Sequence, residues 1–220
     1  MAETKTDPHY PPVDKRMISD VVQMAHRGFL SQSASKILLD AAGINRARQY
    51  RACDEDEALV ALIAIGGPVA MKAVIEEGKQ ARGALALNVS DIGTLKIEFA
   101  RIMNIEGVKA VSIEPMLEGE EVFIYATRKY MGKYDISCGL AGDKAASVKR
   151  ESPVTPQIAS EMVEGFDTSV NKFIFAENIR RVSALCEYAP SILSLEINPL
   201  IGNERSMTAL NARISIDNDD

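Results

Sequence analysis

The stretch Leu195-Glu196-Ile197-Asn198-Pro199-Leu200 carries two polar side chains in an apolar run that a proline interrupts. The apolar residues before it are typical of a strand, so Glu196 and Asn198, two residues apart, should project to the same face. Polar groups on a buried strand need a partner, and carboxylate and amide oxygens suit a hard cation such as Mg²⁺. Alternatively, the two residues only begin a turn before Pro199. Spacing alone leaves both interpretations open.

The composition is that of an ordinary globular protein. Of the 220 residues, 46% are hydrophobic and 25% are charged, which is enough for one large domain or two small lobes. The net charge of -6 argues against nonspecific nucleic-acid binding. We find neither a signal peptide nor an apolar run near the roughly 18 residues that span a bilayer, and so expect a cytoplasmic protein without a membrane partner. The scattered Cys53, Cys138 and Cys186 indicate neither a disulfide framework nor a zinc site.

Both ends of the chain are polar. Residues 1–16 include Pro8, Pro11 and Pro12, and residues 217–220 form a short acidic run. Such segments have little apolar surface to bury, so we expect both to lie outside the folded part of the chain.

Helices and strands alternate along the folded part. Caps, glycine stops and apolar periodicity predict helices at 20–27, 32–42, 54–66, 90–104, 156–164 and 169–188. Period-two and buried apolar runs predict strands at 44–52, 69–74, 83–89, 108–114, 121–128, 133–140, 192–197 and 206–214. The strands at 69–74 and 83–89 should form a hairpin. This order indicates an α/β or α+β fold and excludes a helix bundle or a β-sandwich.

Several segments occur in a characteristic order: 31–39 with 42–44, 67–72, 121–128, 139–142 and 195–200. Their order and spacing resemble the ATP-grasp domain of NDP-forming acyl-CoA synthetases, the family of ADP-forming acetyl-CoA synthetase and succinyl-CoA synthetase. The resemblance covers residues 20–216, and its most specific part is Glu-Ile-Asn-Pro-Leu at 196–200. It implies an ATP-grasp fold of two α/β subdomains, at 17–108 and 109–216, which bind ATP or GTP with Mg²⁺. It also implies a CoA-binding α subunit or domain as partner.

The resemblance assigns nucleotide-binding roles to four residues. Lys72 matches a lysine that the family keeps on the nucleotide phosphates, where a point cation offsets their charge. Glu114 and Met116 match the hinge beside the adenine, where backbone groups read the base, and Glu121 matches an acidic residue near the ribose. Charged residues are mostly exposed, so the alternatives are a lysine reaching solvent from a strand end and two solvated glutamates.

The resemblance also implies a metal site. Asn198 matches the family's metal-ligand asparagine, and Glu196 shares its strand face. The second ligand would be Asn211, within Leu-Asn-Ala-Arg-Ile at 210–214, where the family usually has an aspartate. An amide oxygen can still bind Mg²⁺, but the loss of one negative charge should weaken metal binding.

Two further departures from the family concern loops. The loop at 75–82 is shorter than its counterpart and lacks the histidine that relays phosphate. The chain's histidines, His9 and His26, fall in the N-terminal tail and on the first expected helix, where catalysis is not expected. After the glycine-rich segment 139–142, residues 143–150 are basic, and they either attract phosphate or form a mobile surface loop.

These features leave two functions open. In the first, the chain is the ATP-grasp subunit or domain of an acid-thiol ligase and passes phosphate through a CoA-binding partner that carries the phosphohistidine. In the second, it is a degenerate ATP-grasp module with a structural or regulatory role. Losing a relay histidine and a metal carboxylate removes charge and positioning that phosphoryl transfer needs, so we do not expect the isolated chain to be catalytically competent. A carboxylate-amine ligase is a third alternative, because ATP-grasp enzymes share the nucleotide site and differ in the acceptor.

Overall fold

The chain folds into two units. The computed structural model describes residues 10–75, 84–141 and 147–218. Residues 47–117 form the small unit, and the residues up to 46 together with those from 118 onward form the large unit. This division differs from the expected boundary between residues 108 and 109. The reason is that the strand at 110–115 pairs within the small unit, whereas the opening helices contribute to the core of the large unit.

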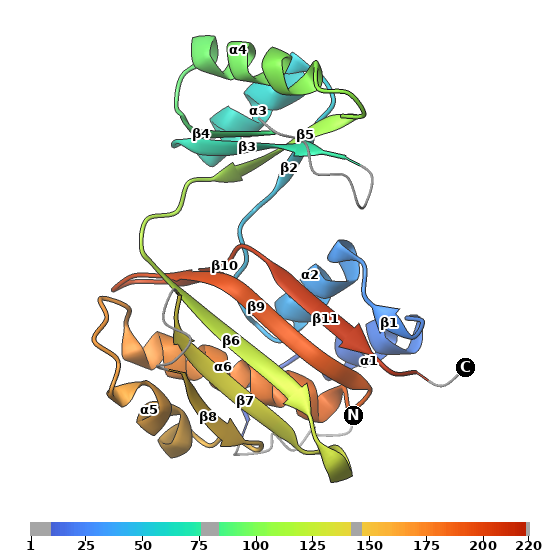
Figure 1. Cartoon of the computed structure of the whole chain (residues 1–220), viewed down its shortest axis with the longest axis vertical. Coiled ribbons are helices and arrows are strands. Elements are labelled where there is room, and N and C mark those ends of the chain that lie inside the picture. Colours follow the sequence, from blue (N-terminus) through green and yellow to red (C-terminus); the bar gives the residue numbers. More distant parts are fainter. Residues whose placement is uncertain (1–9, 76–83, 142–146, 219–220) are drawn as a thin grey trace, which may run out of the picture. The chain divides into compact units, whose positions relative to one another are not determined.

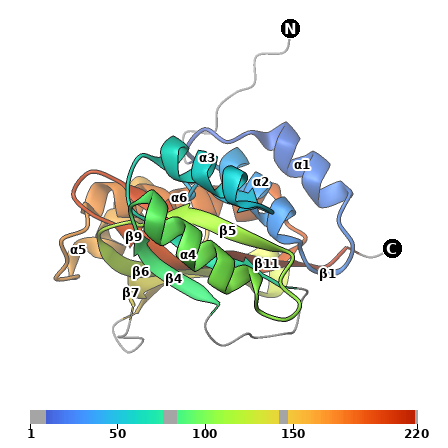
Figure 2. The same ribbon diagram turned by 90° about the horizontal axis from the view of Figure 1, so that it is seen from above.

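The small unit is a four-stranded antiparallel sheet with two helices on one face (Figures 1 and 2). The strand order is β2 (Tyr50–Ala52), β5 (Ala110–Pro115), β3 (Val69–Val74) and β4 (Leu85–Val89). The helices are α3 (Glu55–Ile65) and α4 (Ile92–Met103). The antiparallel pairing of β3 with β4 confirms the expected hairpin pairing.

Local sequence signals explain where α3 begins and ends. Asp54 Oδ1 accepts a hydrogen bond from Glu57 N at 2.8 Å, and Glu57 Oε2 accepts one from Cys53 N at 2.7 Å. This reciprocal capping satisfies backbone donors that the first helical turn leaves open. Gly66 ends the helix in the left-handed region with φ of 73°. The core of the small unit contains Ala58, Ala61 and Leu62 of α3 together with Met71 of β3.

The large unit is a seven-stranded sheet backed by four helices (Figure 1). The strand order is β1 (Gly28–Phe29), β11 (Ala212–Ile216), β9 (Ile192–Gly202), β6 (Glu120–Arg128), β7 (Tyr134–Leu140) and β8 (Val148–Glu151), and β10 (Met207–Ala209) pairs with β9. The helices are α1 (Lys15–Gln23), α2 (Gln32–Ala41), α5 (Pro156–Glu164) and α6 (Lys172–Tyr188). A short 3-10 turn, Tyr130–Gly132, joins β6 to β7.

Alternation along the strands separates a buried face from an open face in each sheet. On β6, Val122, Ile124 and Ala126 are buried in the core of the large unit. The side chains between them, including Tyr125 and Thr127, therefore face the opposite way. Among the described residues, no helix covers this opposite face in either unit (Figure 1). We call it the open face of each sheet.

Residues 10–16 belong to the fold, which corrects the expectation that the whole segment 1–16 lies outside it. Pro11 is buried, and Asp14 N donates a hydrogen bond to Ala41 O at 2.8 Å. Asp14 Oδ1 also caps α1 by accepting from Met17 N at 2.9 Å. Residues 1–9, which include His9, lie outside the described residues.

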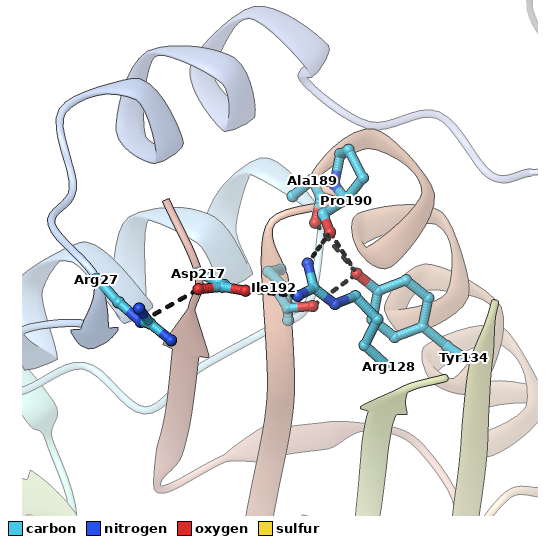
Figure 3. Close-up of polar contacts among 7 residues, drawn as sticks. All are labelled: Arg27, Arg128, Tyr134, Ala189, Pro190, Ile192 and Asp217. Carbon is cyan, nitrogen blue, oxygen red and sulfur yellow. Dashed lines mark hydrogen bonds and ion pairs between the residues drawn. The ribbon is translucent and has the colours of Figure 1, made fainter. Parts of the chain in front are cut away.

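Asp217 and Asn218 also belong to the fold, so the expected tail at 217–220 is wrong for these two residues. Asp217 forms ion pairs with Arg27 at 3.2 Å and Arg128 at 2.8 Å (Figure 3). Asn218 Nδ2 donates to two carbonyl oxygens of the segment that leaves α1, each at 2.7 Å. These contacts attach Asp217 and Asn218 to α1 and to the end of β6. Residues 219–220 lie outside the described part.

Other elements differ from expectation in extent. The expected strand at 44–52 is reduced to β2, because Asn45 O accepts a hydrogen bond from Ala209 N of β10 at 2.8 Å in the large unit. The first helix ends at Gln23, so the exposed His26 lies after it. The expected strand at 206–214 is divided into β10 and β11. No helix in the described part of the chain is long and apolar enough to cross a membrane.

Candidate functional site

Lys72 lies on the open face of the small sheet. Its neighbours Met71 and Ala73 pack in the core of the small unit, so alternation directs Lys72 away from the helices. Its side chain is exposed. Lys72 pairs with Ser112 on β5 and with Leu85 on β4. An ammonium group in this position can meet an anion that approaches the open face.

The carboxylate of Glu114 and the backbone N–H of Met116 already form hydrogen bonds within the small unit. Glu114 Oε1 accepts hydrogen bonds from Gln49 Nε2 at 2.5 Å and from Ser112 Oγ at 3.3 Å. The Met116 N–H, which the expected hinge would offer to an adenine, donates to Pro68 O at 2.8 Å. The Met116 carbonyl, an acceptor, is the remaining backbone group of this residue.

Glu196 and Asn198 lie on the open face of the large sheet beside Tyr125. Tyr125 of β6 pairs with Glu196 of β9, and Asn198 Nδ2 donates to Tyr125 Oη at 2.9 Å. Burial and the neighbouring Glu196 carboxylate raise the pKa of Tyr125, so its hydroxyl remains a proton donor at neutral pH. The donor orientation of the Asn198 amide leaves its Oδ1 directed away from Tyr125.

A bulge in β9 presents Asn198. Ile124 of β6 pairs with Ile197, and Val122 pairs with Leu200, so two residues of β9 oppose one residue of β6. A bulge of this kind bends a strand and redirects a side chain, and bulges are common beside functional sites. Here the two residues of β9 are Asn198 and Pro199, and the one residue of β6 is Phe123.

Asn211 lies next to Asn198, and Glu121 does not. Asn211 O accepts a hydrogen bond from Asn198 N at 3.2 Å, and Asn211 Nδ2 donates to Asn198 O at 3.4 Å. The exposed side chain of Asn211 thus keeps its Oδ1 available. Glu121 shares the open face with Tyr125 but lies four residues earlier, roughly 13 Å away along β6.

The donor set tests whether Mg²⁺ fits this site. It contains one carboxylate, from Glu196, and two amide oxygens, from Asn198 and Asn211. Across the described residues there is no group of three or more histidine, cysteine or acidic side chains that could hold a metal ion. Mg²⁺ is usually bound by one or two carboxylates together with substrate phosphates. These residues therefore fit a Mg²⁺ ion that arrives with a nucleotide, and they fit poorly as a stand-alone metal site.

Tyr125 is the site residue that the sequence analysis missed. Its alternation with the apolar residues of β6 placed it on the exposed face, but its amide partner is 73 residues away in the sequence. Part of the basic segment 143–150 is strand β8, where Lys149 Nζ contacts Asp135 at 3.3 Å. The rest of that segment up to residue 146, and residues 76–82 of the loop that lacks a histidine, lie outside the described residues.

Comparison with known proteins decides the family. A model described as an ATP-grasp domain matches residues 21–216. The chain belongs to the ATP-grasp family. This membership and the mixed helix and strand content confirm the resemblance and the fold class predicted from the sequence.

This ATP-grasp chain is similar in sequence to part of a longer curated protein. It is 30% identical over 207 residues to acetate–CoA ligase (ADP-forming) II of Archaeoglobus fulgidus, covering 85% of this chain and 30% of that protein. The chain thus spans less than a third of its curated relative.

Solved structures share the ATP-grasp fold. PH1788 of Pyrococcus horikoshii matches with a TM-score of 0.73 and 22% identity over 93% of this chain and 100% of that chain. A dinucleotide-forming acetyl-coenzyme A synthetase 1 from Ca. Korarchaeum cryptofilum, in complex with coenzyme A and Ca-AMPCP, matches with a TM-score of 0.74 and 18% identity over the same shares. ATP citrate lyase of Methanosaeta concilii matches at 0.59 and 14%, over 88% of this chain and 50% of that chain.

Proposed function

We propose that this chain is the ATP-grasp subunit or domain of an NDP-forming acyl-CoA synthetase, and that it binds Mg-ATP for phosphoryl transfer together with a CoA-binding partner. The observation that carries the proposal is that Glu196 and Asn198 both lie beside Tyr125 on the open face of the large sheet, and that Asn211 is hydrogen-bonded to the backbone of Asn198. The name of the Archaeoglobus relative, an acetate–CoA ligase, supports both the reaction class and a CoA-binding partner subunit or domain. We place the protein in the cytoplasm.

Each proposed role follows from the chemistry of the side chain. Lys72 would offset charge on the nucleotide phosphates as a point cation. Glu196, Asn198 and Asn211 would hold Mg²⁺ through one carboxylate and two amide oxygens. The bound Mg²⁺ would supply charge neutralisation for the transferred phosphoryl group. Tyr125 would orient Asn198 by occupying its amide nitrogen. Glu114, Met116 and Glu121 would contact the base and the ribose, with ATP or GTP as the nucleotide.

A second function is favoured by the composition of the same site. Asn211 supplies an amide where a carboxylate would bind Mg²⁺ more tightly, and the exposed His26 is outside this group of residues. A chain with a weakened metal site and no phosphate-relaying histidine of its own would serve as a structural or regulatory ATP-grasp module. In the first function the partner provides the phosphohistidine. In the second function nucleotide binding is weak or absent.

Calorimetric titration of Lys72→Ala and Asn198→Ala with Mg-ATP tests the proposal. We expect Lys72→Ala to weaken nucleotide binding with or without Mg²⁺, because it removes a charge from the phosphates. Asn198→Ala should weaken binding only when Mg²⁺ is present. Lys96→Ala is the matched control, because Lys96 on α4 pairs with Glu55 at 3.6 Å and does not lie on the sheet. Unchanged affinity in both test variants would count against the assigned sites.

A further inference from the structure

Three neighbouring strands of the small sheet align Arg51, Ser112 and Lys72 in one transverse row. Arg51 of β2 pairs with Ser112 of β5, and Ser112 pairs in turn with Lys72 of β3. Leu85 of β4 ends the row at the sheet edge. Paired residues on adjacent strands have side chains on the same face, so the two cations flank Ser112.

Burial shows that this row faces away from the helices. Ala52, Val111 and Met71 alternate with the row residues, and all three have no exposed surface in the core of the small unit. Arg51 and Lys72 are both exposed. The cationic groups are therefore on the open face, next to solvent.

The spacing of the row fits a chain of phosphates. Neighbouring strands lie about 4.8 Å apart, so the backbones at Arg51 and Lys72, two strands apart, are separated by about 10 Å. Long, flexible side chains at that separation can reach successive phosphate groups of one ligand. The guanidinium adds bidentate hydrogen bonds, which the ammonium group of Lys72 cannot form.

These two cations have no ion-pair partner among the described residues. Elsewhere in the chain, Arg46, Arg128 and Lys149 each contact a carboxylate at 3.3 Å or less. Glu114, which is two residues from Ser112 on β5, accepts hydrogen bonds from Gln49 and Ser112 instead. An anion on this face would thus meet two positive charges that the described part of the protein leaves unneutralised.

We propose that Arg51 is a second phosphate-binding residue, and that Arg51 and Lys72 together bind the polyphosphate chain of a nucleoside di- or triphosphate. This inference rests on the proposed function and extends it by naming a residue on β2. It predicts that the small unit distinguishes ligands by the number of phosphates, because successive phosphates give each cation its own anionic group, whereas a single phosphate must be shared.

The test is titration of the full chain with ATP and AMP at a fixed Mg²⁺ concentration, using Arg51→Gln, Arg51→Lys and Lys72→Gln. Losing a hydrogen-bonded charge should weaken ATP binding about tenfold in Arg51→Gln. AMP affinity should change less than about twofold, and Arg51→Lys should recover part of the loss because it keeps the charge. Lys96→Gln, the matched control on α4, should bind like the wild type.

The outcomes separate this inference from the proposed function. If Lys72→Gln weakens ATP binding but Arg51→Gln does not, Arg51 has no phosphate role and the proposed function stands. Equal losses for ATP and AMP in Arg51→Gln would also overturn the inference, because the residue would then act through the base, the ribose or the fold. Absence of ATP binding by the wild-type chain would overturn both.

Discussion

The side-chain amide of Asn198 donates a hydrogen bond to the Tyr125 hydroxyl at 2.9 Å, joining the adjacent strands β9 and β6 of the large sheet. The bond fixes which end of the amide faces the tyrosine. Because the nitrogen is used, the oxygen of Asn198 is the end left for a cation. The Tyr125 hydroxyl thus determines which atom of the Asn198 amide faces away from it.

Tyr125→Phe should reduce the Mg²⁺ dependence of nucleotide binding. The variant keeps the ring, which stacks on Phe123 with centroids 4.7 Å apart, and removes only the hydroxyl. The amide of Asn198 can then rotate, so we expect Mg-ATP affinity to fall about three- to tenfold while Mg²⁺-free affinity is unchanged. Calorimetry measures both affinities. Tyr130→Phe is the control, because Tyr130 is 91% exposed, and equal behaviour of the two variants would contradict the orienting role.

Asn211→Asp should lower the Mg²⁺ concentration required for half-maximal ATP binding. The change places a second carboxylate beside the backbone of Asn198, and carboxylates bind Mg²⁺ more strongly than amides. We expect a decrease of about threefold or more, measured by titrating Mg²⁺ at constant ATP. Asn104→Asp, at the exposed end of α4, controls for the added charge. An Asn211→Asp variant that responds like this control would show that the residue does not face the metal.

Glu120 should contribute an acid-sensitive part of the stability. Hydrogen bonds from Thr168 and Ser169 to its carboxylate lower the pKa of Glu120 from its usual value of 4.5. A lowered folded-state pKa means that the stabilisation is present above the unfolded-state pKa and is lost as pH falls through the folded-state pKa. Glu120→Gln should therefore lower the free energy of unfolding at pH 7 by about 1 kcal/mol or less and flatten its decline below about pH 4.5.

Denaturant unfolding between pH 7 and pH 3 measures this difference. The neighbouring Glu118→Gln is the control, because the exposed Glu118 uses its backbone carbonyl, and not its carboxylate, to accept from Asn203. Parallel pH profiles for wild type and Glu120→Gln would refute the assignment.

Asp217→Asn should destabilise the large unit. The change removes the negative charge that pairs with the mostly exposed Arg27 and with Arg128, whose side chain, like that of Asp217, is only 26% exposed (Figure 3). We expect a loss of about 1–2 kcal/mol in the free energy of unfolding, measured by urea denaturation.

A double-mutant cycle with Arg128→Gln isolates the pairwise contribution. Asp20→Asn is the control, because Asp20 pairs with Arg16 at 3.9 Å and both side chains are mostly exposed. If Asp217→Asn is as stable as this control, the C-terminal ion pairs contribute no measurable stability.

Local signals in the sequence were enough to predict most helices and strands. They did not predict which distant segments pair with one another. Ser31 and Asp54 cap helices where predicted, because an N-cap depends on residues three positions away. The unit boundary was misplaced, because nothing near residue 110 indicates that β5 pairs with β3. The same limit hid Asp217, whose partner Arg128 is 89 residues away.

Part of the candidate site was likewise predicted from local patterns, and part of it was not. The spacing of Glu196 and Asn198 predicted their shared face, because period-two alternation is a local property. Their contact with Tyr125 depends on the register of β6 against a bulged β9, which no local pattern specifies. The row that contains Arg51 depends on two strand pairings, β2 with β5 and β5 with β3, so local sequence patterns could not predict it either.

The most direct measurement is calorimetric titration of the wild-type chain with ATP, with and without Mg²⁺, and with GTP for comparison. The account predicts binding that Mg²⁺ strengthens, because one carboxylate and two amides hold the ion only together with nucleotide phosphates. Failure to bind either nucleotide at millimolar concentration in the presence of Mg²⁺ would contradict the account and identify a fold kept for assembly or regulation.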